Sequence, residues 1–317
     1  MLRYVTRRVI QMIPLLIGIS IVIFTIIQAA PGGPEGVLLD RGMFVDPAAI
    51  DAYRERLGVD QPIYIQYIRW IGAMLTGDMG VSFQTQRAVF DMILERLPDT
   101  LRLMGVSFLI AAMIAIPLGI YSSVRQYSVF DYLATGFSFV AIAMPVFWFG
   151  LMLQFIFSVR LQWLPVAGTV TVGVGTFVDK VKHIIMPATV LSLHYIAGWS
   201  RYMRSSMLGV LKQDYVRTAH SKGLTRRYVI AVHAVKNAAI PVVSVMTLSI
   251  ARLFSGAVIT ETIFGWPGIG RMFIQAMHAR DYPLLMGIMM MGSTMVVVFN
   301  LIADVIYGWL DPRISYE

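Results

Sequence analysis

Residues 103–124 read LMGVSFLIAAMIAIPLGIYSSV and contain no charged side chain. A bilayer core of about 30 Å requires about 20 mostly apolar helical residues, so this run is long enough to cross a membrane. Other uncharged runs occupy 9–30, 132–159 and 183–200, and two more, 237–260 and 282–310, are each broken by one charge, Arg252 and Asp304. The sequence therefore predicts an all-α integral membrane protein with six transmembrane helices.

The composition of the whole chain agrees with a membrane protein. Of its 317 residues, 57% are hydrophobic and 14% are charged, whereas soluble domains average about 25% charged residues. So few charges would leave a soluble protein with very large apolar patches. The formal net charge is +8, and its basic residues lie in loops between the uncharged runs, which favours membrane topology over nucleic-acid binding. The absence of cysteine excludes disulfides and thiol chemistry.

Basic residues predict the orientation of these helices. Segment 201–236 holds eight Lys or Arg and one acid, whereas segment 31–98 holds six Arg and nine acids. Because cytoplasmic loops carry an excess of Lys and Arg, 201–236 is predicted to be cytoplasmic, 31–98 translocated, and both termini cytoplasmic. The first run is longer than the 7–15 residues of a signal-peptide core, so we expect a membrane helix there.

Five runs contain an internal proline, which removes a backbone hydrogen bond and favours kinked helices packed against one another. The prolines are Pro14, Pro117, Pro145, Pro187 and Pro241.

The basic segment has a more detailed pattern. Residues 211–228 read LKQDYVRTAHSKGLTRRY and predict two helices around a break, with Gly223 at positive φ, Leu224 in an apolar contact and Thr225 as the next N-cap. The alternative is a charged loop that only sets topology. Helical spacing places Leu211, Tyr215, Val216, Ala219 and His220 on one side, and leaves Lys212, Arg217 and Lys222 for water or a partner.

These residues carry a family resemblance. Residues 214–224 (DYVRTAHSKGL), followed by 233–241 (HAVKNAAIP), resemble the EAA loop of ABC-transporter permeases in the form found in dipeptide and oligopeptide permeases. Arg217 and Thr218 depart from the general Glu-Ala-Ala, whereas Ala219 and Gly223 are in register. Further matches in order along the chain are 31–34 (PGGP), 57–62 (LGVDQP), 76–80 (TGDMG), 261–271 (ETIFGWPGIGR), 280–283 (RDYP) and 311–314 (DPRI).

The resemblance implies a type I ABC importer permease fold in a prokaryotic inner membrane. It implies a peripheral first helix in 1–30, an extracytoplasmic segment in 31–98 and a five-helix core in 99–317. It also implies partners: a homologous second permease, two cytoplasmic ABC ATPase subunits and an extracytoplasmic solute-binding protein. Short peptides are the implied substrate, with nickel chelates or oligosaccharides as alternatives. The coupling residues would be Asp214, Tyr215, Arg217, Thr218, Ala219, Lys222, Gly223 and Leu224.

The chain itself is not expected to be an enzyme. It has no G-x-x-x-x-G-K-[ST] loop, so ATP and Mg would bind to partner subunits, and no cofactor, metal or catalytic site is predicted here. A different class, an ion-coupled secondary transporter, would need an intramembrane proton relay, for which only Asp304 and His194 are available.

Three other features are candidates for the transport path or its outer end. Arg252 could line the pathway, pair with the partner permease or bind backbone carbonyls. Pro145 and Trp148 could also line the pathway. The turn predicted near Gly265 could form an outer gate, contact a binding protein or be structural; its candidates are Glu261, Trp266, Pro267 and Gly268.

Within the translocated segment, an apolar stripe between Leu57 and Leu75 predicts a helix. It could pack on the bundle or offer a docking face. Its members are Ile63, Tyr67, Trp70, Ile71 and Met74.

Overall fold

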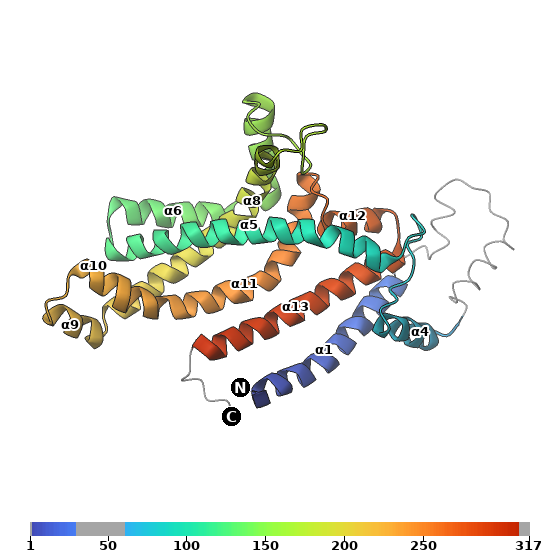
Figure 1. Ribbon diagram of the computed structural model, residues 1–317, viewed down its shortest axis with the longest axis horizontal. Coiled ribbons are helices and arrows are strands. Elements are labelled where there is room, and N and C mark those ends of the chain that lie inside the picture. The colour runs from blue at the N-terminus through green and yellow to red at the C-terminus, as the bar shows by residue number, and fades with distance from the viewer. Residues whose placement is uncertain (1, 30–60, 311–317) are drawn as a thin grey trace. The chain divides into compact units, whose positions relative to one another are not determined.

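The computed structural model describes residues 2–29 and 61–310, and within these ranges it contains helices and turns but no β-strand. The predicted matches at 31–34 and 311–314, and most of 57–62, lie outside the described residues. The all-α prediction is confirmed (Figure 1). In chain order the helices are α1 (Leu2–Ala29), α4 (Ile63–Leu75), α5 (Val89–Val124), α6 (Val129–Ala143), α7 (Val146–Leu153), the π-helix η1 (Gln154–Arg160), α8 (Phe177–Leu211), α9 (Asp214–Ser221), α10 (Arg226–Tyr228), the π-helix η2 (Val229–Ala234), α11 (Val235–Ile263), α12 (Ile269–His278) and α13 (Tyr282–Leu310).

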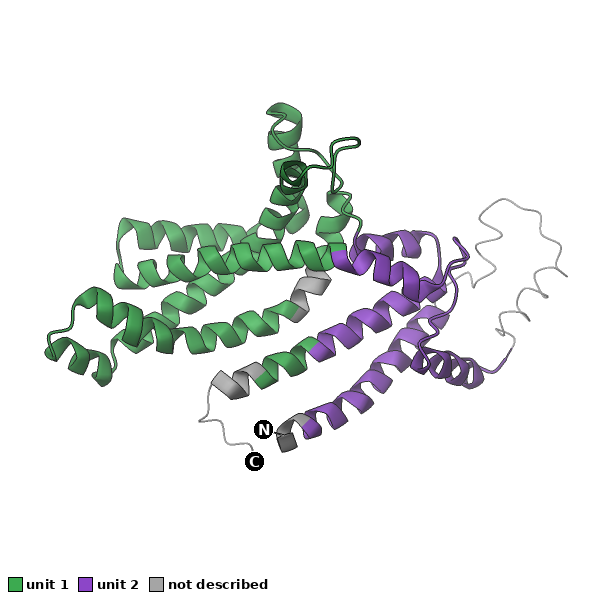
Figure 2. Ribbon diagram, viewed as in Figure 1, with its two compact units in different colours: residues 1, 99–267, 299–317 green, residues 2–98, 268–298 purple. Residues whose placement is uncertain are grey.

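The chain divides into two compact units (Figure 2). Unit 1 contains Asp99–Pro267 and the segment that begins at Phe299, and unit 2 contains Leu2–Pro98 and Gly268–Val298. The predicted core region 99–317 therefore contributes to both units. The predicted division into 1–30, 31–98 and 99–317 stays a prediction.

Four helices in the described residues are long and apolar enough to cross a membrane, and a bent pair adds a fifth if it forms one span. The four lie at Thr6–Ala29, Val89–Val124, Arg226–Ile250 and Tyr282–Val305. The predicted fourth span, 183–200, lies within the 35-residue helix α8, which is not among the four. The chain is a multi-pass helical protein, and the count of six crossings stays a prediction.

The predicted third span is sharply bent at Pro145, one of the prolines that were predicted to kink the helices. Run 132–159 is divided between α6 and the α7–η1 segment, which meet at an angle of 103°. Pro145 has no N–H, and steric conflict with its ring disfavours helical backbone at the residue before it. Met144 is accordingly extended, with φ −77° and ψ 123°, and α6 ends at Ala143. By contrast, Pro187 and Pro241 lie inside α8 and α11.

Unit 1 is built around α8, which packs against α6 and α11. Trp199 of α8 is 2% exposed and lies edge-on to Phe108 of α5, with ring centroids 5.1 Å apart. The backbones of α5 and α8 come close at Gly119, where an added Cβ would lie 2.6 Å from the Cβ of Met203. A side chain at position 119 would therefore force these helices apart.

Unit 2 contains α1, α4 and α12 together with the first residues of α5 and most of α13. The predicted stripe on α4 is confirmed as a packing face, because Tyr67, Trp70 and Met74 contact a buried cluster of α1 and α13 side chains. Ile63 and Ile71 of the predicted stripe do not belong to this cluster, and Ile63 is 64% exposed. The buried members of the cluster are Ile23, Phe24, Met286 and Met290.

Candidate functional site

The predicted helical break in the basic segment is present as an elbow, which we define as residues 212–228. It lies where α8 ends and the chain returns towards α11 (Figure 1). α9 ends at Ser221, and Gly223 follows with φ +78°, a conformation that glycine adopts without steric cost. The Gly223 amide donates to the carbonyl of His220 at 3.0 Å. Thr225 occupies the N-cap position of α10, but its side chain makes no capping hydrogen bond.

The elbow has one buried side. Val216 and Ala219 of α9 pack with Val229 of η2, and all three side chains are 6% exposed or less. The structure corrects two placements, because Tyr215 and His220 were expected on this side but are exposed. Helical spacing alone does not show how wide the covered stripe is. Leu224 was expected in an apolar contact, but its side chain is 37% exposed and does not belong to this buried cluster.

The outer surface of α9 is polar and accessible, so it could meet a partner protein. Ala219 is the exception among the predicted coupling residues, since it anchors the elbow from inside. The exposed predicted coupling residues are Asp214, Tyr215, Arg217, Thr218, Lys222, Gly223 and Leu224.

An ion pair that sequence reasoning missed links three elements of unit 1 close to the elbow. Arg204 of α8 donates from Nε and a terminal nitrogen to the two carboxylate oxygens of Asp131, each at 2.7 Å. Ser122 of α5 donates to the same carboxylate at 2.5 Å, and the amide of Tyr127 donates at 3.0 Å. Asp131 is 3% exposed. A bidentate, fully hydrogen-bonded pair of this kind fixes the α5–α6 turn against α8.

A capping pattern in the sequence could have pointed to Asp131. Residues 128–131 have the form Ser-x-x-Asp before an apolar run, which is a helix-start signature. Ser128 is indeed the N-cap of α6, and its hydroxyl accepts from the Asp131 amide at 3.3 Å. The pattern predicts the cap but cannot identify Arg204 as the ion-pair partner.

The loop between η1 and α8 is tied down at the opposite end of α8 from the elbow. Thr171 donates to Asp179 from both its amide and its hydroxyl, each at 2.7 Å. These two hydrogen bonds lower the pKa of Asp179 below its ordinary value, and the nearby His183 contributes to the same shift. Gln154 of η1 donates to the carbonyls of Val166 and Ile263. The bent α7–η1 segment is therefore held by both the loop and the end of α11.

The predicted tight turn after α11 is present. Gly265 has φ +57°, and α12 begins at Ile269. Glu261 is fully buried and accepts a 2.7 Å hydrogen bond from Thr100. Trp266 is 2% exposed and its indole N–H donates to the carbonyl of Asp99 at 2.9 Å. This burial favours a structural role for both side chains over a surface contact, and an outer gate stays a prediction.

The other predicted pathway residues remain untested. Pro145 is the N-cap of α7, and Trp148 is 47% exposed on that helix. The backbone at Arg252 belongs to α11, but its side chain lies outside the described residues.

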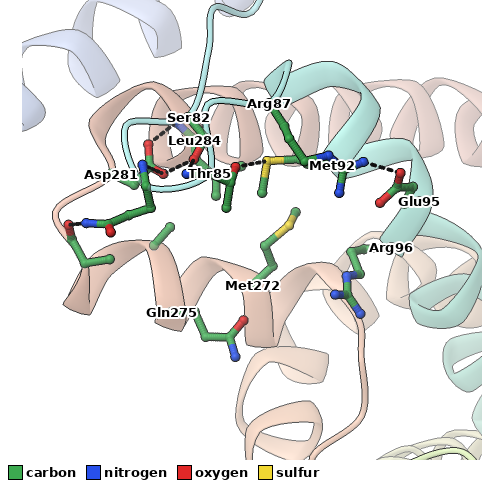
Figure 3. Close-up of a pocket in the computed structure, with 13 residues that line it drawn as sticks. Ser82, Thr85, Arg87, Met92, Glu95, Arg96, Met272, Gln275, Asp281 and Leu284 are labelled. Atoms are coloured by element: carbon green, nitrogen blue, oxygen red, sulfur yellow. Dashed lines mark hydrogen bonds and ion pairs between the residues drawn. The ribbon is translucent and has the colours of Figure 1, made fainter.

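A second feature absent from the sequence reasoning is a cavity of about 260 Å³ in unit 2 (Figure 3). On one side Asp281, 1% exposed, accepts from the Ser82 hydroxyl at 2.5 Å and from the Phe83 amide at 3.1 Å. On the other side Arg87 forms an ion pair with Glu95. The lining also includes Gln84, Thr85, Met92, Arg96, Met272, Gln275, Ala276, Ala279 and Leu284.

Comparisons with known proteins identify the family. Residues 115–316 match the family described as binding-protein-dependent transport system inner membrane component, and residues 1–104 match the description of its N-terminal part. The chain is 42% identical over 318 residues to the oligopeptide transport system permease protein AppB of Bacillus subtilis. It is 37% identical over 340 residues to the dipeptide transport system permease protein DppB of Escherichia coli. Both matches cover the whole of each chain.

Solved structures support the same fold. A chain of the MetNI methionine ABC transporter in inward facing conformations aligns with TM-score 0.56 at 12% identity, over 69% of this chain and 96% of that one. A chain from the structure described as an amino acid ABC transporter with histidines aligns with TM-score 0.51 at 14% identity. The alignment covers 68% of this chain and 93% of that one. The fold is therefore that of ABC importer permeases. The chain belongs to the family of binding-protein-dependent transport system inner membrane components.

Proposed function

We propose that this chain is the membrane-spanning permease subunit of an ATP-driven importer of short peptides. The observation that carries the proposal is its full-length identity of 42% with a protein named as an oligopeptide transport permease. The dipeptide transport permease protein DppB of Escherichia coli, at 37% identity, adds support. This chain would form part of the transport path, and partner subunits would supply the energy by hydrolysing ATP.

The proposed assembly has a homologous second permease, two cytoplasmic ABC ATPases and an extracytoplasmic solute-binding protein. The excess of basic residues in 201–236 supports a cytoplasmic elbow and cytoplasmic termini in a prokaryotic inner membrane. Segment 61–98 would then face the binding protein, and the exposed charges of Arg87, Glu95 and Arg96 beside the cavity suit a polar docking face.

The elbow is the proposed point of energy transfer. Its buried residues Val216 and Ala219 fix α9 against η2, while Tyr215, Arg217 and Lys222 remain exposed for an ATPase. A displacement of α9 would pass into α8, whose last turns are tied to α6 through Arg204 and Asp131. Two-state transitions commonly use rigid elements of this kind.

ATP-dependent uptake tests the proposal. The chain would be co-expressed with its partner subunits, reconstituted into liposomes, and supplied with a labelled tripeptide on its binding protein. We expect uptake and peptide-stimulated ATP hydrolysis in the wild type, and loss of both in Gly223→Pro, because proline cannot adopt φ +78°. Gly209→Ala, on α8 with open space around it, is the matched control and should transport normally.

A surface variant separates misfolding from lost coupling. Tyr215→Ala combined with Arg217→Ala changes only exposed side chains of α9, so the fold should be unaffected while coupling falls. Normal transport by both this variant and Gly223→Pro would contradict the elbow's role. Uphill uptake by the chain alone, driven by an ion gradient, would contradict the ATP-driven mechanism itself.

A further inference from the structure

Unit 1 contains a second cavity, of about 690 Å³, between α5 and α8. This volume lies within the range of about 300–1,000 Å³ that is typical of ligand sites. Its walls are the first part of α8, part of α5, two residues of the loop before α8, and Trp266 from the turn after α11. The lining residues are Arg102, Val106, Ile110, Thr169, Val170, Phe177, Lys180, Val181, Ile184, Ile185, Ala188 and Trp266.

The two helical walls repeat one pattern. On α5, Arg102 is followed at four-residue intervals by Val106 and Ile110, and residues at this spacing share a helix face. On α8, Lys180 is followed at the same intervals by Ile184 and Ala188. Eight residues at 1.5 Å per residue correspond to about 12 Å. Each wall therefore carries one cation at its outer end and about 12 Å of apolar surface beyond it.

The two cations are accessible to an anion. The Arg102 side chain is 59% exposed while it donates to Asp99 at 3.0 Å. Lys180 is exposed and makes no ion pair in the part of the chain that the structure describes. Asp179, the acid next to Lys180, is already engaged by Thr171. The mouth of the cavity thus favours a negatively charged group.

Beyond the mouth, the cavity offers few hydrogen-bonding groups. Apart from the two cations, only Thr169 and Trp266 have polar side chains, and the Trp266 indole already donates to the carbonyl of Asp99. A peptide backbone placed there would leave its N–H and C=O groups without partners, at a cost of several kcal/mol in apolar surroundings. A hydrocarbon chain has no such groups to satisfy.

We propose that this cavity holds one acyl chain of an anionic phospholipid, with the phosphate between Arg102 and Lys180. Basic pockets between membrane helices bind anionic headgroups in this way. The cavity lies where α8 begins, whereas the elbow follows its other end. The lipid would therefore come from the leaflet opposite the elbow, the outer leaflet in the proposed orientation. The inference requires membrane insertion but not peptide transport.

Counting retained lipids tests the inference. The full chain in detergent is equilibrated with an equimolar mixture of phosphatidylglycerol and phosphatidylcholine, and bound phospholipids are counted by native mass spectrometry. We expect the wild type to retain phosphatidylglycerol preferentially. In Arg102→Gln/Lys180→Gln this preference should fall about tenfold to thirtyfold. Lys182→Gln is the matched control: Lys182 is exposed on the same helix but does not line the cavity, so its loss should leave the preference unchanged.

A second variant addresses the apolar part of the site. Ile185 lines the cavity and is 40% exposed, so Ile185→Trp should occupy acyl-chain space without overpacking the core. We expect it to retain less of both lipids while the double-charge variant loses only selectivity. This second measurement decides the question if the double variant fails to fold.

Three outcomes would overturn the inference. The first is that Arg102→Gln/Lys180→Gln keeps the lipid preference of the wild type, or that Ile185→Trp binds as much lipid as the wild type. The second is displacement of the lipid by a tripeptide with a free carboxylate, which would make the cavity a peptide site. The third is loss of the lipid when the partner permease associates, which would make it a subunit contact. None of these measurements involves uptake, so a negative result would leave the proposed transport function intact.

Discussion

Arg204 of α8 and Asp131 of α6 form a bidentate ion pair with two 2.7 Å hydrogen bonds, although 73 residues separate them in the chain. The carboxylate is buried, and the arginine side chain is 26% exposed. Charges inside membrane bundles usually pair or face water. This pair joins the start of α6 to the part of α8 that leads into the elbow, so it can transmit movement between the two helices.

Breaking this pair should destabilise the protein strongly. Arg204→Gln leaves the Asp131 carboxylate buried with only the Ser122 and Tyr127 donors, and loss of one partner of a buried pair typically costs about 3–5 kcal/mol. Thermal unfolding in detergent should show the loss. The double variant Asp131→Asn/Arg204→Gln should lose less unfolding free energy than the sum of the losses in the two single variants.

The exposed pair of Asp214 and Arg217 provides the control. Its atoms are 3.7 Å apart and the two side chains are 98% and 75% exposed. Arg217→Gln should therefore change stability by less than about 1 kcal/mol. Equal losses in Arg204→Gln and Arg217→Gln would refute the structural importance of the Asp131 pair.

Gly119 should not tolerate even a methyl group. The added Cβ of Gly119→Ala would lie 2.6 Å from both the Met203 Cβ and the Ser200 carbonyl oxygen, so α5 and α8 must separate. We expect a loss of about 1–3 kcal/mol in unfolding free energy. Gly105→Ala, on the same helix with nothing within 4 Å, should be neutral or stabilising. A neutral Gly119→Ala would show that these helices pack less closely than described.

Acid should loosen the loop before α8. Because Thr171 lowers the pKa of Asp179 in the folded state, the stabilisation is fully present above the unfolded-state pKa of about 4 and is lost as pH falls towards the lower folded-state value. Melting temperatures measured from neutral pH down to about pH 3 should fall in the acid range for the wild type. The Asp179→Asn variant should have a lower melting temperature than the wild type at neutral pH, and its melting temperature should fall less steeply as the pH is lowered. The melting temperature of Asp214→Asn should fall with pH as steeply as that of the wild type.

Asp281 should control the order of the segment that precedes α5. Asp281→Asn replaces a carboxyl oxygen by an amide NH2 facing the Ser82, Phe83, Gln84 and Leu284 donors. We expect the unfolding free energy to fall by about 1–3 kcal/mol, and amide hydrogen exchange at residues 81–88 to become faster. Asp78→Asn is the control, since Asp78 is exposed and, among the residues that the structure describes, accepts only from the Gly80 amide. Unchanged exchange in Asp281→Asn would exclude this anchoring role.

Local rules predicted much of the candidate site. Gly223 at positive φ and the break between α9 and α10 follow from turn chemistry, which acts within a few residues. The packing face of Tyr67 and Trp70 follows from helical spacing. The exposure of Tyr215 and His220 was not predicted, because the width of a covered stripe depends on which element packs against it, here η2.

The sequence by itself determined the helical class, the apolar runs and the elbow. The apolar runs follow from the absence of charge over lengths that match the bilayer, and the breaks at proline and glycine follow from local backbone geometry. The tertiary structure decided the pairing of Asp131 with Arg204 and the burial of Glu261. Each of these depends on the distance between segments far apart in the chain. Local periodicity does not encode that distance, which is set by the packing of several helices together.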